Sequence, residues 1–256
     1  MTDTAASAPA RPHVLVLRHV DFEHPGTYTP ALEAVAELRT VRAGTDPVPA
    51  DPGDAAALVV MGGPMGVGDA GELPWLREEI DLVARAQDRG TPVWGVCLGA
   101  QVLAAAAGAR CHPGDAPEVG VSTLVETTDA HGVALSSDDP VWHGLLDGTP
   151  ALHWHGDTFE LPEGATLLAG TDSYPHQLVR LGGSYGVQFH LEVTPDMVDE
   201  WLAIPEYADA LRRVHGEAGP ETVRRQVARA AEAMREAAGE AMRRWVATWA
   251  PGPAGA

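Results

Sequence analysis

Residues 93–101 read Val-Trp-Gly-Val-Cys-Leu-Gly-Ala-Gln, and they decide the fold that we expect for the chain. A short apolar run ends at a cysteine, and an alanine-rich segment of helical composition follows at once. Gly95 and Gly99 stand two residues either side of Cys97, where a Cβ would crowd a tight turn. The pattern predicts a strand, a sharp turn and a helix, with the thiol held at the carboxyl edge of a sheet. The N-terminus of the following helix favours a thiolate, so Cys97 is the candidate nucleophile.

Strand-like and helical patterns alternate over the first hundred residues. Short apolar runs predict strands over residues 13–17, 40–42, 56–61 and 91–96. Apolar residues at helical spacing predict helices over residues 28–38, 74–89 and 98–107. This alternation is typical of βαβ units, so we expect an α/β fold with a mostly parallel sheet.

The pattern changes after Gly108. Short strand-like runs separated by turn residues follow, over residues 109–126, 150–155, 165–170, 176–181 and 185–190. They predict a small antiparallel excursion before the chain returns to the main sheet. A short helix is expected over residues 194–203, because Thr194 is a suitable N-cap and Pro195 suits the first helical position.

The C-terminal part is predicted to be helical from residue 206 onward. Between residues 220 and 249, apolar side chains recur at steps of three and four, with Arg and Glu between them. We interpret this helix as packed on its own domain; a docking face for a partner, or for a second copy in a homodimer, is the alternative. The expected division is a disordered tail over residues 1–12, a domain over 13–205 and a C-terminal helical extension over 206–250.

The composition excludes several classes of partner. The 256 residues carry 36 acidic and 17 basic side chains, a formal net charge of −19, and no lysine. Such a chain repels phosphate backbones and anionic lipids, so we expect neither nucleic acid nor membrane as a partner. No apolar run approaches the roughly 20 residues that span a bilayer, and no signal peptide is recognisable. With two distant cysteines expected as thiols, a cytoplasmic location is predicted.

A cysteine nucleophile needs a base, and the base needs an orienting group. Residues 184–195 read Ser-Tyr-Gly-Val-Gln-Phe-His-Leu-Glu-Val-Thr-Pro. On a strand, His190 and Glu192 would lie on the same side, two residues apart. A carboxylate placed there fixes the tautomer of the imidazole and stabilises the imidazolium. The pair alone is a weak signal, but together with Cys97 it becomes a strong candidate for base and orienting group.

Acyl chemistry also needs N–H donors for the oxyanion that develops in the transition state. Gly62-Gly63-Pro64 follows the predicted strand over 56–61, and its glycines can turn backbone N–H groups outward. Together with the N–H of Leu98, directly after Cys97, they predict a pocket with two donors. An ordinary Gly-Pro turn is the alternative for this tripeptide.

Four motifs then follow one another along the chain. They are MGGPMG at 61–66, GVCLGAQ at 95–101, HWHGD at 153–157 and GVQFHLEVTP at 186–195. In this order they resemble the class I (triad) glutamine amidotransferases, in particular the free-standing proteins similar to the amidotransferase domain of GMP synthetase. The resemblance covers residues 13–203.

The resemblance implies a three-layer α/β/α, Rossmann-like (flavodoxin-like) fold with a nucleophile elbow and a Cys97–His190–Glu192 triad. It implies an oxyanion hole from the amides of Gly63 and Leu98. The residues expected to bind the substrate are Gly62, Gln101, Trp154, His155 and Asp157. The implied reaction hydrolyses the γ-amide of glutamine through a γ-glutamyl thioester and releases ammonia and glutamate; no metal and no cofactor are expected.

Two positions depart from the family pattern. Leu191 stands where a proline is common, with little expected effect because only its neighbours act. Trp154 stands where a small serine commonly helps to bind the amino-acid end of glutamine, which leaves the recognition of plain glutamine open. His153, His155 and Asp157 also alternate as metal ligands on a strand would, but we interpret this segment as a wall of the substrate pocket.

Three functions are compatible with these residues. The first is a glutaminase or amidotransferase that supplies ammonia to a separate synthetase, since the sequence shows no phosphate-binding loop with its lysine. The second is a γ-glutamyl peptide or amide hydrolase that acts alone. The third is a non-catalytic regulatory module on the same fold, against which the intact Cys, His, Glu and Gly-Gly set argues.

Overall fold

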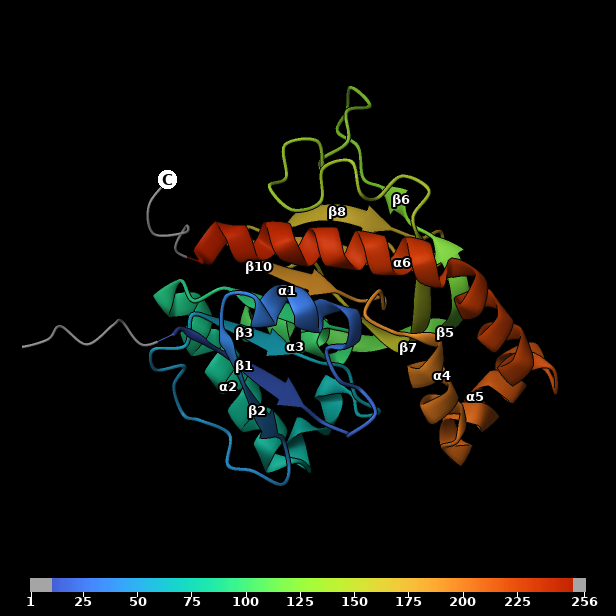
Figure 1. The fold of residues 1–256 in the computed structure, drawn as a ribbon, viewed down its shortest axis with the longest axis horizontal. Helices are drawn as coiled ribbons and strands as arrows, with labels where there is room; N and C mark the ends of the chain where they lie inside the picture. Colours follow the sequence, from blue (N-terminus) through green and yellow to red (C-terminus); the bar gives the residue numbers. More distant parts are fainter. Residues whose placement is uncertain (1–10, 251–256) are drawn as a thin grey trace, which may run out of the picture.

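The computed structural model describes residues 11–250, so most of the predicted tail over residues 1–12 lies outside the described residues. An eight-stranded sheet organises the chain, in the order β2-β1-β3-β4-β10-β9-β8-β6 (Figure 1). Its strands are β1 (His13–Arg18), β2 (Glu37–Arg42), β3 (Ala57–Val60), β4 (Val93–Val96), β6 (Val125–Glu126), β8 (Thr166–Gly170), β9 (Leu178–Leu181) and β10 (Ser184–Val187). The first five strands in this order pair in parallel, and the remaining pairs are antiparallel.

Helices cover both faces of the parallel half, which gives three layers. Along β1, Val14 lies in one apolar core and Leu15 in the other. The first core includes α1 (Thr29–Glu33) and α6 (Gly219–Trp249), and the second includes α2 (Pro74–Arg89) and α3 (Leu98–Ala106). Parallel strands that are apolar on both sides require such cover on both faces. The predicted three-layer α/β/α fold is therefore confirmed.

The turn between β4 and α3 lies closely against neighbouring backbone. A Cβ on Gly99 would lie 2.0 Å from the carbonyl oxygen of Val60, and one on Gly95 would lie 2.3 Å from the carbonyl oxygen of Gly99. Both contacts involve backbone, so no side chain can rotate away to admit a methyl group. The N–H of Cys97 donates to the carbonyl of Val187 (2.8 Å), which ties the turn to β10.

Gly99→Ala is expected to lower the free energy of unfolding by about 3 kcal/mol, because α3 would have to move off β3. The matched control is Gly68→Ala, where an added Cβ meets nothing within 4 Å. That substitution is expected to change the free energy of unfolding by less than about 0.5 kcal/mol. Urea denaturation measures both, and equal stability of the two variants would contradict the close packing of the turn.

The antiparallel part consists of the sheet half formed by β10, β9, β8 and β6 and of a separate two-stranded ribbon. In the ribbon, β5 (Cys111–Thr123) pairs with β7 (Pro150–Phe159). The predicted antiparallel excursion is thus present. The runs predicted over 165–170, 176–181 and 185–190 correspond to β8, β9 and β10, which belong to the main sheet.

Three helices complete the described chain. α4 (Pro195–Leu202) begins after Thr194, whose hydroxyl accepts a hydrogen bond from the N–H of Met197, as expected for an N-cap. α5 (Pro205–His215) contacts α4 and β5 at one end of the molecule, and α6 runs along one face of the sheet (Figure 1). The buried side chains of α6, Trp245 among them, belong to the first core. The division into a domain and a C-terminal extension stays a prediction.

One predicted helix is wrong in its extent. Residues 28–38 show helical spacing, but α1 ends at Glu33 and β2 begins at Glu37. The N–H of Glu37 donates to the carbonyl of Pro12 (2.9 Å), and β2 pairs in parallel with β1 along its whole length. Pairing with a neighbouring strand therefore outweighs the spacing of a few apolar residues.

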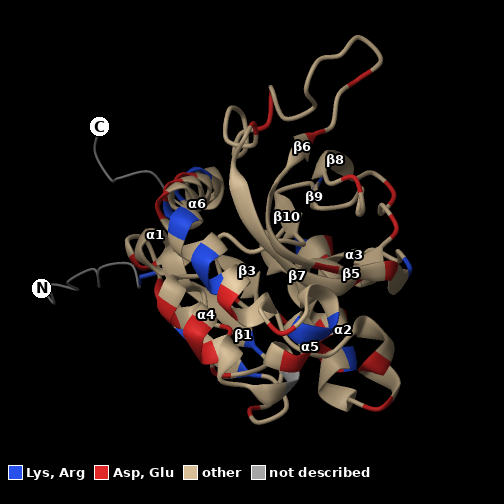
Figure 2. Ribbon diagram, turned by 90° about the vertical axis from the view of Figure 1, so that its right-hand side faces the viewer, with Lys and Arg blue, Asp and Glu red and all other residues tan. Residues whose placement is uncertain are grey.

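Charged side chains of both signs lie interspersed on the surface. Figure 2 shows acidic residues spread over several elements rather than gathered in one patch. On α6, Arg235 pairs with Glu232 and Arg243 with Glu240, each three residues apart. Exposed pairs of this kind contribute little each. Among residues 11–250, no helix combines the length and the apolar character needed to cross a membrane.

Candidate active site

Cys97 stands at the sharp turn between β4 and α3 and has a strained backbone. Its φ of 51° is the only positive φ of a non-glycine residue among residues 11–250. Such conformations cost about 1–3 kcal/mol each and cluster at active sites. The side chain is 8% exposed and lies at the start of α3, whose first N–H groups have no partner within the helix. The strand–turn–helix elbow predicted from the sequence is therefore present.

The pairing of β4 with β10 brings His190 to Cys97. The two strands are parallel neighbours, so their carboxyl ends lie at the same edge of the sheet. Cys97 directly follows β4, and His190 lies three residues after β10. The backbone of His190 also exchanges two hydrogen bonds with Leu152 of β7, at 2.8 and 3.1 Å. The topology thus fixes the histidine from two sides.

Glu192 orients the ring of His190. Nδ1 of His190 lies 2.6 Å from Oε1 of Glu192, and both side chains are almost fully buried. Burial alone would lower the pKa of His190, but the charge of Glu192 and hydrogen bonds to Cys97 and Glu192 raise the pKa well above its usual range. A protonated imidazole of this kind stabilises a neighbouring thiolate.

Cys97 faces a cavity of about 630 Å³. Eight of the ten predicted site residues line it: Cys97, His190, Gly63, Leu98, Gln101, Trp154, His155 and Asp157. The other two, Glu192 and Gly62, are absent from its lining: Glu192 bonds to His190, and the carbonyl of Gly62 bonds to a ring nitrogen of His19 (2.8 Å). A larger groove of about 1310 Å³ between α1 and α6 contains none of the ten.

Gly63 and Leu98, the predicted oxyanion donors, both line the cavity with Cys97. A Cβ on Gly62 would lie only 3.4 Å from the Cβ of Cys97, so the glycine loop lies against the candidate nucleophile. The N–H of Leu98 belongs to the first turn of α3 and has no carbonyl partner within the helix. Both residues thus line the cavity beside the thiol, and their role as donors to an oxyanion stays a prediction.

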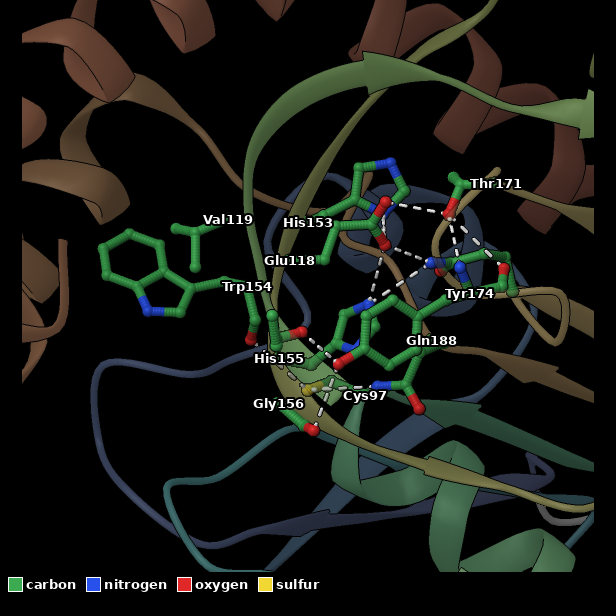
Figure 3. Close-up of polar contacts among 12 residues, drawn as sticks. Cys97, Glu118, Val119, His153, Trp154, His155, Gly156, Thr171, Tyr174 and Gln188 are labelled. Atoms are coloured by element: carbon green, nitrogen blue, oxygen red, sulfur yellow. Dashed lines mark hydrogen bonds and ion pairs between the residues drawn. The ribbon is translucent and has the colours of Figure 1, made fainter. Parts of the chain in front are cut away.

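Gln188 is a site residue that the sequence reasoning missed. Its Nε2 donates to Sγ of Cys97 (3.7 Å; Figure 3), and its Oε1 accepts from Nε2 of Gln101 (3.3 Å). Gln101 therefore contacts the thiol through Gln188 as well as lining the cavity. Its own Oε1 is buried without a hydrogen-bond partner among residues 11–250. The available signal was spacing, since Gln188 precedes His190 by two residues.

An aromatic wall and a buried carboxyl group complete the cavity; of these residues only Trp154 was predicted from the sequence. The ring of Trp154 packs edge-on against Trp201 and tilted against Tyr207, with centroids 5.6 Å apart in both pairs. The hydroxyl of Tyr207 donates to Oε1 of Glu23 (2.6 Å), and burial raises the pKa of Glu23. Glu23 lies in the loop after β1, and β1 ends at the same sheet edge as Cys97. This place after a parallel strand was the sequence feature from which Glu23 could have been predicted as a site residue.

His153, His155 and Glu118 form a mostly buried cluster beside the cavity (Figure 3). Oε2 of Glu118 lies 3.4 Å from Nδ1 of His153 and 3.3 Å from Nε2 of His155. One ligand atom from each residue lies within 4.8 Å of the others, a spacing compatible with a metal ion. Both carboxylate oxygens already accept hydrogen bonds, however, from Thr171 (2.8 Å) and Gln177 (2.6 Å). We therefore interpret the cluster as a polar network that joins β5 to β7.

Asp157 is not part of that cluster, although strand alternation groups it with the two histidines. Its carboxylate lies beside Gly66, where an added Cβ would approach Oδ2 to 2.7 Å. Cys111, the second thiol, donates to the carbonyl of Gln101 (3.3 Å). Burial and the charge of Asp157 raise the pKa of Cys111 to about 12, so this thiol stays protonated and unreactive near neutral pH.

Comparisons with known proteins place this geometry among related folds. A family model described as "Glutamine amidotransferase class-I" matches residues 31–203. A glutamine amidotransferase-like protein of Salmonella typhimurium, YfeJ, is 31% identical over 211 residues, which cover 78% of this chain and 84% of the relative. A GMP synthase [glutamine-hydrolyzing] of Porphyromonas gingivalis is 33% identical over 153 residues, or 57% of this chain. The match covers 26% of that relative, so the chain spans about a quarter of its length.

Two solved structures superpose on nearly the whole of this chain. A glutamine amidotransferase of Methylobacillus flagellatus superposes with a TM-score of 0.80 at 25% identity, covering 96% of this chain and 98% of that protein. A glutamine amidotransferase of Thermotoga maritima gives a TM-score of 0.78 at 24% identity, covering 92% and 98%. The second likeness shows the fold alone.

Proposed function

The chain belongs to the class-I glutamine amidotransferase family, and on this basis we propose that it hydrolyses the γ-amide of glutamine through a γ-glutamyl thioester on Cys97. In this proposal His190 and Glu192 complete a catalytic triad, and the released ammonia serves a separate synthetase. One observation carries the proposal: the strained Cys97 meets a histidine oriented by a carboxylate within one cavity.

The proposed reaction begins with acylation of Cys97. The thiolate attacks the δ-carbon of glutamine, and the negative charge moves to the carbonyl oxygen. The N–H groups of Gly63 and Leu98 are the proposed donors to that oxygen; losing one donor of this kind costs about 10²–10³ in kcat. His190, protonated, gives its proton to the amide nitrogen, so that the C–N bond breaks and ammonia leaves.

Deacylation reverses the roles of the same groups. The neutral imidazole of His190 takes a proton from water, and the hydroxide attacks the thioester carbon. The tetrahedral intermediate collapses, the C–S bond breaks, and glutamate leaves while Cys97 returns to the thiolate. Glu192 stabilises the imidazolium that forms in this step and holds its ring in place.

The proposal is tested by incubating the purified protein with glutamine and measuring glutamate and ammonia. We expect both products in equal amounts and, after acid quenching, an intact-mass adduct of one γ-glutamyl group on Cys97. The opposite outcome has two parts: no turnover of any γ-glutamyl amide, and no labelling of Cys97 by a glutamine-analogue alkylator. Together they would sink the enzymatic proposal and favour a non-catalytic module on this fold.

A separate synthetase is the proposed consumer of the ammonia. The P. gingivalis relative is named for glutamine hydrolysis within a GMP synthase, and this chain matches only a quarter of it. Ammonia that is used in a synthesis is best released only when the acceptor is ready. Glutamine turnover that rises when a candidate synthetase is added would support this part of the proposal, and turnover indifferent to every candidate would argue for an enzyme that acts alone.

A γ-glutamyl peptide or amide hydrolase is the second candidate, and the wall formed by α5 favours it. Tyr207, Ala210, Arg213 and Val214 of α5 line the cavity, and α5 begins beyond residue 203, where the family match ends. A cavity of about 630 Å³ is within the range of pockets that hold drug-sized ligands, larger than a single amino acid. The space and the Arg213 guanidinium suit a second residue with a free carboxylate.

Arg213→Met separates the two candidates. For a γ-glutamyl amino acid, we expect kcat/KM to fall about tenfold, because the guanidinium would no longer pair with the carboxylate of the second residue. Glutamine lacks that residue, and its kcat/KM is expected to change less than about twofold. Steady-state kinetics with glutamine and γ-glutamyl-alanine measure both. An equal loss on the two substrates would contradict the assignment of Arg213 to the leaving group.

A further inference from the structure

A second His–Glu pair, which the proposed reaction does not use, lies beneath the loop of Gly62 and Gly63. His19 directly follows β1 and Glu79 lies on α2, and both side chains are fully buried. Nε2 of His19 lies 2.9 Å from Oε2 of Glu79, and Nδ1 lies 2.8 Å from the carbonyl oxygen of Gly62. The ring also packs against Trp75, with centroids 5.7 Å apart. The imidazole thus connects α2 to the glycine loop.

Both ring nitrogens of His19 face groups that accept hydrogen bonds. A carbonyl oxygen only accepts, so Nδ1 must carry a proton and donate it to Gly62. Burial alone would lower the pKa of His19, but the charge of Glu79 and hydrogen bonds to Glu79 and Gly62 raise it. His19 therefore holds the carbonyl of Gly62 by a hydrogen bond from Nδ1, and the raised pKa favours the charged ring, which strengthens that bond.

The hydrogen bond to Gly62 sets the direction of the next N–H group. In a trans peptide, the C=O and the N–H point to opposite sides of the C–N bond. No cis peptide occurs among residues 11–250. With the carbonyl of Gly62 turned to His19, the N–H of Gly63 must point away from His19. Gly63 lines the cavity that contains Cys97.

Close contacts hold the loop in place without fixing its peptide plane. A Cβ on Gly62 would lie 2.1 Å from Oε2 of Glu23, and one on Gly63 would lie 2.9 Å from the Cβ of His19. Side chains are excluded there, and a peptide between two glycines can adopt either sign of φ on both sides. The hydrogen bond from His19 therefore selects one orientation among several that the glycines allow.

We propose that His19 and Glu79 are positioning residues, which hold the Gly62–Gly63 peptide so that the N–H of Gly63 faces the oxyanion. This inference rests on the proposed function, because the oxyanion forms only if Cys97 attacks an amide. Neither side chain lines the cavity, so the pair acts through the peptide and not on the substrate. The bond to the oxyanion strengthens in the transition state, so the pair affects kcat more than KM.

The test compares His19→Asn with His19→Gln. The amide nitrogen of asparagine reaches the place of Nδ1, which bonds to Gly62, whereas that of glutamine reaches the place of Nε2, which bonds to Glu79. With glutamine as substrate, we expect His19→Asn to keep kcat within about fivefold and His19→Gln to lose about 10²-fold. KM is expected to change less than about threefold in both. A merely structural role, in which the bond to Glu79 stabilises the fold, predicts the reverse order.

Two controls separate a loss of oxyanion binding from a loss of folding or of Cys97 reactivity. Alkylation of Cys97 by iodoacetamide needs no oxyanion hole, so its rate is expected to be unchanged in both variants. Should His19→Gln fail to fold, Glu79→Gln serves in its place. It leaves a neutral ring whose single proton still bonds to Gly62, and we expect a loss of less than about tenfold in kcat.

The outcomes distinguish this inference from the function on which it rests. Equal kcat for His19→Asn and His19→Gln, or a loss above 10²-fold for Glu79→Gln in a folded protein with reactive Cys97, would overturn the positioning role while wild-type turnover stands. A wild-type protein that turns over no γ-glutamyl amide would overturn the proposed function, and this inference with it.

Discussion

Cys97→Ala is expected to reduce glutamine hydrolysis by at least about 10⁴-fold, because no γ-glutamyl thioester can form without the sulfur. The fold should persist. Besides its hydrogen bond to His190, Sγ has long contacts with Nε2 of Gln188 (3.7 Å) and the carbonyl of Trp154 (4.0 Å). Its loss enlarges the cavity without creating a closed void. Alanine bears the same positive φ, so we expect the free energy of unfolding to change by about 1 kcal/mol or less.

The measurement pairs product release with intact mass. Wild-type protein quenched during turnover should carry the γ-glutamyl adduct, and Cys97→Ala should carry none. Cys111→Ala is the matched control, since Cys111 is the other thiol and donates only to a backbone carbonyl. It should keep full activity and the adduct. Wild-type turnover in Cys97→Ala, or lost turnover in a folded Cys111→Ala, would refute the assignment of the nucleophile.

The fold could be predicted from sequence where one local pattern specified one structure. The apolar run before Cys97 and the glycines around it predict a strand–turn–helix elbow. Glycine is required there because an added Cβ on Gly95 or Gly99 would collide with a neighbouring backbone oxygen. Alternation of strands and helices likewise led to the three layers. The exception is residues 28–38, where helical spacing competes with parallel pairing of β2 to β1. That pairing joins segments more than twenty residues apart and leaves little trace in local periodicity.

The candidate site could be predicted only where its residues stood in a motif. Cys97 and His190 belong to quoted motifs, and the structure brings both to one cavity. Glu23 and Tyr207 also line that cavity, but they come from a loop and from α5, and only packing brings them together. His19 could not be predicted either, because its partner is the backbone carbonyl of Gly62, and no pattern of side chains in the sequence indicates a bond to a backbone group.

Glu192→Gln is expected to lower kcat about 10²- to 10⁴-fold. Glutamine keeps the size of the side chain and can still accept from Nδ1 of His190, so the ring keeps its place. The negative charge is lost, and with it the main influence that opposes burial at His190. The imidazolium then becomes harder to form, both beside the thiolate of Cys97 and during deacylation. Thioester formation in a single turnover should slow in step with kcat.

The pH dependence of Glu192→Gln separates a charge effect from a packing effect. In the wild type the pKa of His190 is raised, so the proton that ammonia needs is kept as pH rises and is lost only above the raised pKa. Without the carboxylate, burial lowers that pKa, and the alkaline limb of kcat/KM should move to lower pH.

The stability of the fold depends on pH with the same sign. The His190–Glu192 pair stabilises the fold below the unfolded pKa of histidine near 6.5, and this contribution is lost as pH rises through the raised folded pKa. The difference in melting temperature between wild type and variant should therefore shrink at high pH. If the alkaline limb of kcat/KM did not shift and the difference in melting temperature did not depend on pH, Glu192 would act through packing alone.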